Sequence, residues 1–101
     1  MPEPNPPLRL SAQRALLGAI GPGVLGISVA LEGGRLAFDG FVAADATEDE
    51  REALDLAASE MLADFPEVKR LDLDISEAPD ATLPDRGGEW VFLRLGTGVG
   101  R

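Results

Sequence analysis

The stretch that most constrains the fold begins at Thr47. Thr47 and Glu50 form a T-x-x-E capping box, in which each side chain accepts a hydrogen bond from a backbone N–H at the start of a helix. Apolar residues then recur at spacings of three and four, at Leu54, Ala57, Ala58, Met61, Leu62 and Phe65. This spacing predicts one apolar stripe that packs against a core, and Phe65-Pro66 predicts the end of the helix.

Four other segments alternate apolar and polar residues, which is typical of strands with one buried face. They are residues 24–31, 36–44, 67–77 and 89–95. Gly33-Gly34 between the first two predicts a tight hairpin, because such turns need positive φ. A short helix is expected over residues 12–20 with Ser11 as its N-cap, so the predicted order is αββαββ.

This order predicts an α+β two-layer sandwich, with a four-stranded, largely antiparallel sheet and both helices on one face. The sequence leaves open whether the last two strands pair across the eleven-residue loop 78–88. At 101 residues the chain is long enough for one domain, which we expect at 9–95. Residues 1–8 are expected to form an extended Pro-rich arm and 96–101 a flexible Gly-rich tail.

The charge of the chain limits the classes of partner that it can bind. The net charge is −9, and between Asp45 and Asp64 eight carboxylates face the single cation Arg51. This balance argues against nucleic-acid binding and against anionic membranes, and it favours a basic protein partner. The N-terminus does not read as a signal peptide, and no apolar run approaches the length of a membrane span, so we expect a cytoplasmic protein.

Catalytic chemistry has few candidates, because the chain lacks His, Cys and Tyr. The segment 21–26 matches G-x-G-x-x-G, but a helix precedes it and a strand follows, which is the reverse of a dinucleotide site. No cofactor is therefore expected. Asp72 and Asp74 share one strand face and could hold a hard cation or act as acid and base. Alternating Asp is also how a solvated sheet face looks, and we favour that interpretation, with no metal and no enzymatic activity.

Partner binding has two candidate surfaces. The alternation places Trp90, Phe92 and Phe41 on the exposed sheet face with Asp72 and Asp74, a composition typical of a hot spot for a basic, apolar partner. Alternatively, Trp90 packs under the Pro-rich loop or the N-terminal arm, or this face forms a homodimer. The second surface is the acidic helix, whose candidate residues are Glu52, Asp55 and Glu60.

Several segments together resemble a known group of proteins: 14–20 (RALLGAI), 27–29 (ISV), 47–52 (TEDERE), 57–68 (AASEMLADFPEV) and 89–94 (EWVFLR). They are similar to small acidic bacterial immunity proteins of polymorphic toxin and contact-dependent inhibition systems. The resemblance implies a protein that binds a toxin's catalytic domain and blocks it.

Three hypotheses follow. The first is a non-enzymatic immunity protein that neutralises a basic toxin domain. The second is a structural or assembly module that homodimerises through its open sheet face. The third is a small enzyme that uses Asp72, Asp74 or the helix acids with a metal. A salt-sensitive complex with a basic protein would favour the first hypothesis. A mass that depends on concentration would favour the second, and tight divalent-ion binding would favour the third.

Overall fold

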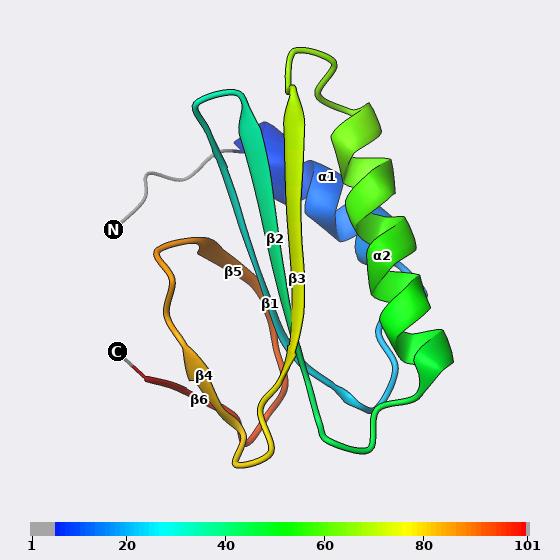
Figure 1. Cartoon of the computed structure of the whole chain (residues 1–101), viewed down its shortest axis with the longest axis vertical. Helices are drawn as coiled ribbons and strands as arrows, with labels where there is room; N and C mark the ends of the chain where they lie inside the picture. The colour runs from blue at the N-terminus through cyan, green and yellow to red at the C-terminus, as the bar shows by residue number, and fades with distance from the viewer. Residues whose placement is uncertain (1–5, 101) are drawn as a thin grey trace.

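Two helices cover one face of a four-stranded sheet in the computed structural model, which describes residues 6–100 (Figure 1). The helices are α1 (Pro6–Leu16) and α2 (Glu48–Ala63). The strands are β1 (Val24–Glu32), β2 (Arg35–Val42), β3 (Arg70–Glu77), β4 (Thr82–Pro84), β5 (Glu89–Leu93) and β6 (Gly98–Gly100). The predicted α+β class, with helices on one face, is confirmed. No helix within residues 6–100 is both long and apolar enough to cross a membrane.

The sheet is mixed, in the order β3-β2-β1-β5. β1 pairs antiparallel with β2 through the predicted hairpin and antiparallel with β5 on its other side. β3 pairs parallel with β2, so the largely antiparallel expectation is wrong at this edge. The reason is α2, which lies between β2 and β3 in the chain and returns it to the same end of the sheet. The last two predicted strands do not pair, because β3 and β5 occupy opposite edges.

The main core lies between the sheet and the helices. The stripe predicted on α2 is buried at Leu54, Ala57, Ala58 and Met61. It packs with Leu8, Ala12 and Leu16 of α1 against the sheet residues Val24, Ile27, Val29, Leu36, Phe38 and Val42. The capping box at Thr47 and Glu50 is present as predicted.

The first helix begins earlier than predicted. Residues 6–8 belong to α1 rather than to an extended arm, and residues 1–5 of the predicted arm lie outside the described residues. Proline is tolerated in the first turn of a helix, where its missing N–H has no intrahelical partner to lose. Leu8, Ala12 and Leu16 then form a buried stripe at intervals of four. Ser11 lies inside this helix, and its hydroxyl donates to Asp64 Oδ2 at 2.7 Å instead of capping the helix.

The C-terminal tail is also more ordered than expected. Gly98–Gly100 forms β6, which pairs parallel with β4, a strand inside the segment predicted to be a loop. The ribbon formed by these two strands lies over the sheet face that the helices leave open, hereafter the open face (Figure 1). Leu83 of β4 is fully buried beneath it, and this burial explains why the ribbon forms.

Candidate functional site

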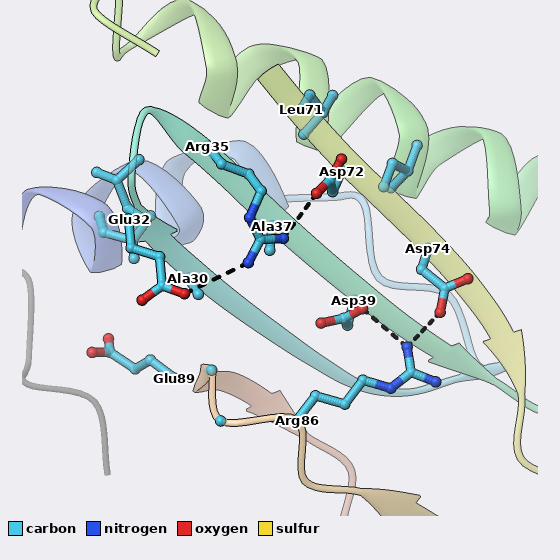
Figure 2. Close-up of a pocket in the computed structure, with 15 residues that line it drawn as sticks. Ala30, Glu32, Arg35, Ala37, Asp39, Leu71, Asp72, Asp74, Arg86 and Glu89 are labelled. Carbon is cyan, nitrogen blue, oxygen red and sulfur yellow. Dashed lines mark hydrogen bonds and ion pairs between the residues drawn. The ribbon is translucent and has the colours of Figure 1, made fainter. Parts of the chain in front are cut away.

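A cleft of about 810 Å³ lies on the open face, beside the β4–β6 ribbon. Ala30 and Ala37, a cross-strand pair of β1 and β2, are among its lining residues, and their small side chains leave room above the sheet. The charged residues that line it are Glu32, Arg35, Asp39, Asp72, Asp74, Arg86 and Glu89. Residues with five carboxylates and two guanidiniums thus line one hollow, although Glu89 points away from the other charged groups (Figure 2).

Arg86 holds the two aspartates at the centre of this cleft. Its Nη1 donates to Asp39 Oδ1 at 3.2 Å and to Asp74 Oδ2 at 2.5 Å (Figure 2). The hydrogen bond from Arg86 lowers the pKa of Asp74 below its ordinary value. The pKa of Asp39 is raised instead, because loss of solvent around this more buried carboxyl outweighs the attraction of Arg86. Asp39 and Asp74, which are paired across β2 and β3 and share one cation, therefore have pKa values shifted in opposite directions, because burial dominates only at Asp39.

Asp72 is bound by two other arginines. Arg70 donates from Nε to Oδ1 at 2.8 Å and from Nη2 to Oδ2 at 3.0 Å, and Arg35 donates to Oδ2 at 2.8 Å. These bonds, those from Arg70 first, lower the pKa of Asp72. Asp72 and Asp74 lie on the open face as predicted, but they are ion-paired rather than simply solvated. Within residues 6–100, no group of three Asp or Glu side chains is arranged to hold a metal ion.

The predicted aromatic hot spot is not an open patch. Phe41 lies on the expected face but is only 1% exposed, because Leu83 and Ala78 cover it. Trp90 packs against Phe41 with their ring centroids 5.8 Å apart, and it joins the same small cluster. The prediction of an exposed ring is therefore wrong for Phe41. Trp90 is half-buried and packs with Leu83 of the Pro-rich loop, as the alternative described, and its role in partner binding stays a prediction. We use the name ribbon cluster for Leu25, Phe41, Ala78, Leu83 and Trp90.

Phe92 lies on the other face of the sheet. Ser28 pairs with Trp90 and Ile27 with Phe92, so Val91 is an extra residue in β5 and forms a bulge. The bulge breaks the alternation, and Phe92 packs against the helix-side core. The expectation that Phe92 shares a face with Trp90 is therefore wrong. Arg94 instead places its guanidinium 5.3 Å from the Phe92 ring centre.

The second predicted surface is exposed. Glu52, Asp55 and Glu60, hereafter the α2 acids, all point to solvent. No ion pair involves them among the described residues, whereas all five cleft carboxylates have an arginine within 4 Å. Leu56, which is 68% exposed, lies among them on the same helix. The α2 acids therefore carry negative charge that neighbouring arginines do not balance.

Sequence reasoning missed five of the seven charged cleft residues, namely Glu32, Arg35, Asp39, Arg86 and Glu89. The alternation of residues 35–41 with Phe41 places Arg35 and Asp39 on the open face, and this signal was present. The position of Asp39 beside Asp74 depends on the parallel register of β2 and β3, which the sequence does not encode locally. Arg86 lies in the segment between β4 and β5, and its contacts depend on how this segment crosses the sheet.

The fold and its charges define a small acidic α+β domain with a charged cleft on its open face. The chain belongs to the MafI2 immunity protein family, whose model matches residues 5–95. No curated protein matches the chain. Family membership confirms the immunity-protein class that the resemblance implied. The link to contact-dependent inhibition systems stays a prediction.

Proposed function

We propose that this protein neutralises a toxin by binding a basic surface of the toxin domain, without catalysing a reaction. Membership of the MafI2 immunity family carries this proposal, since an immunity protein acts on a toxin. The basic character of the partner is the finer part of the proposal. It is supported by the net charge of −9 and by the unpaired α2 acids.

The two acidic surfaces have different electrostatic roles in this proposal. Carboxylates that already have an arginine partner, such as Asp72 and Asp74, project little field beyond the cleft. The α2 acids have no such partner and attract cations from a distance that salt limits to about 8 Å at physiological ionic strength. Charge of this kind mainly accelerates association and selects partners. We therefore assign steering of the toxin to the outer face of α2.

Inhibition by occlusion also agrees with the side chains present. Nucleophilic attack by Ser or Thr needs an adjacent base, and the chain has no His. The central carboxylates of the cleft are occupied by Arg86, Arg35 and Arg70. A toxin whose surface is covered by this protein cannot reach its substrate. The inhibitor therefore does not need to catalyse any reaction.

The test is capture of the partner from lysate of the native organism, with the full chain as bait and elution by increasing salt. A single basic polypeptide, eluted between low and moderate salt, is the expected result. A bait in which the α2 acids are replaced by Gln, Asn and Gln is the matched control, and it should release the partner at lower salt. Recovery of the bait alone, with a doubled mass by light scattering, would instead support the homodimeric module.

A further inference from the structure

β3 is a long and regular edge of the sheet. It has eight residues, pairs with β2 along its whole length without a register shift, and has a strand neighbour on one side only within the described chain. An edge of this kind presents a row of unpaired N–H and C=O groups that another strand can pair with. The opposite edge, β5, has only five residues and carries the bulge at Val91, both of which obstruct pairing.

The geometry identifies which groups face outward. The Ala78 N–H donates to the Val42 carbonyl at 2.8 Å, so the alternation of a strand turns the N–H groups of Ser76 and Asp74 toward β2 as well. The N–H groups of Leu73 and Ile75 consequently point away from the sheet. Their side chains are only half-buried on the helix face, and a strand added here would cover them further.

Self-association along this edge places like charges together. A second copy that continues the sheet with its helices on the same side must pair antiparallel, with open-face residues opposite each other. Registers centred on Asp72, Leu73 or Asp74 then set Asp72 against Asp72, Asp72 against Asp74, or Asp74 against Asp74. Aspartates directly opposite each other are destabilising. The register centred on Asp72 also sets each Asp74 against an Arg70, so like charge disfavours a second copy in the other two registers.

A strand that carries basic residues would be attracted to this edge rather than repelled by it. Arg35 belongs to β2, and Arg86 also contacts Asp39 of β2, so both hold the β3 aspartates from the side away from the free edge. Arg70 also pairs with Asp72, but its side chain is 69% exposed, and such surface pairs contribute little and rearrange readily. Lys or Arg at alternate positions of an added strand would lie opposite Asp72 and Asp74.

We propose that the toxin adds a β-strand to the free edge of β3, with basic residues opposite Asp72 and Asp74 and apolar residues beside Leu73 and Ile75. This inference rests on the proposed function and specifies how the partner is held. Main-chain hydrogen bonds would supply affinity, and the alternating charges would supply register and selectivity. The α2 acids, on the other layer, would act on the approach of the partner.

The test uses a synthetic peptide of alternating lysine and valine with the full chain, and reads backbone amide exchange by NMR. In the free protein the amides of Asp74 and Ser76 should exchange slowly and those of Leu73 and Ile75 quickly. Saturating peptide should slow exchange at Leu73 and Ile75 by about tenfold or more. A peptide in which glutamate replaces lysine is the control and should produce no protection.

Paired variants separate this edge from general acidity. D72N/D74N and D45N/E67Q each remove two charges, the second pair at exposed acids outside both proposed surfaces, and thermal melts check that both fold. The first should weaken peptide binding about fivefold, from two lost cross-strand charge pairs, and the second by less than about twofold. Three outcomes would overturn the proposal. They are amides of Leu73 and Ile75 that stay unprotected at saturation, no binding up to millimolar peptide, or equal effects of both variants. A salt-sensitive toxin complex with unprotected β3 amides would refute the β3 edge and leave the proposed function standing.

Discussion

Replacing Trp90 with alanine distinguishes a structural ring from an interface ring. A tryptophan side chain buries roughly 150–250 Å², and at about 25 cal/mol per Å² complete burial contributes about 4–6 kcal/mol. Trp90 is only partly buried, against Phe41 and Leu83. We therefore expect Trp90→Ala to lower the free energy of unfolding by about 2–4 kcal/mol, in line with core aromatic truncations.

The assay is urea unfolding followed by circular dichroism, because Trp90 is the only tryptophan and its removal abolishes the fluorescence signal. Leu95→Ala is the control, since Leu95 is fully exposed nearby and its loss should change stability by less than about 0.5 kcal/mol. An unchanged unfolding midpoint for Trp90→Ala, combined with lost affinity for the toxin, would refute the placement of this ring in the ribbon cluster.

Three further changes test other parts of the account. Gly26→Ala should destabilise the fold by about 1–3 kcal/mol, measured by thermal melting, because the new Cβ would lie 2.4 Å from Leu83 Cδ1. Neutralising the α2 acids should leave stability within about 0.5 kcal/mol and slow association several-fold at low salt, measured by stopped flow; an unchanged rate would contradict steering. Hydrogen bonds lower the pKa of Glu50, Asp72 and Asp74, so the stability they contribute is present above their ordinary values and is lost as pH falls through the lowered ones. Burial raises the pKa of Asp39, which therefore acts in the opposite direction. We expect the urea concentration at the unfolding midpoint, measured from pH 7 to 2, to decrease once the pH is below about 4. The decrease should be less steep than the three carboxylates alone would give.

The parts of the fold that local chemistry determines were predictable. Thr47 and Glu50 define the start of α2 within four residues of sequence. The apolar stripe from Leu54 to Met61 lies on one side of this helix and therefore packs against a core. The β1–β2 hairpin likewise depends on Gly33 and Gly34, which adopt positive φ. These elements formed where the sequence placed them because their determinants lie within one or two turns of chain.

The remaining features depend on contacts between distant segments. The bulge at Val91 moves Phe92 to the helix face, and no residue type in β5 signals it. The pairing of β6 with β4 follows from burial of Leu83 over the sheet, which only the assembled fold provides. The same applies to the cleft, where Arg86 meets Asp39 across 47 residues of sequence. Composition therefore gives the net charge of −9 but not which carboxylates are paired.

Neutralisation by direct binding is the central claim, and a survival assay tests it most directly. The basic protein retained from lysate would be expressed in a bacterial host alone and together with this chain, and viable cells would be counted. We predict that the captured protein kills the host when expressed alone, that co-expression restores growth, and that the two purify as a complex that high salt dissociates. A captured protein that is harmless alone, or that kills equally in the presence of this chain, would contradict the account.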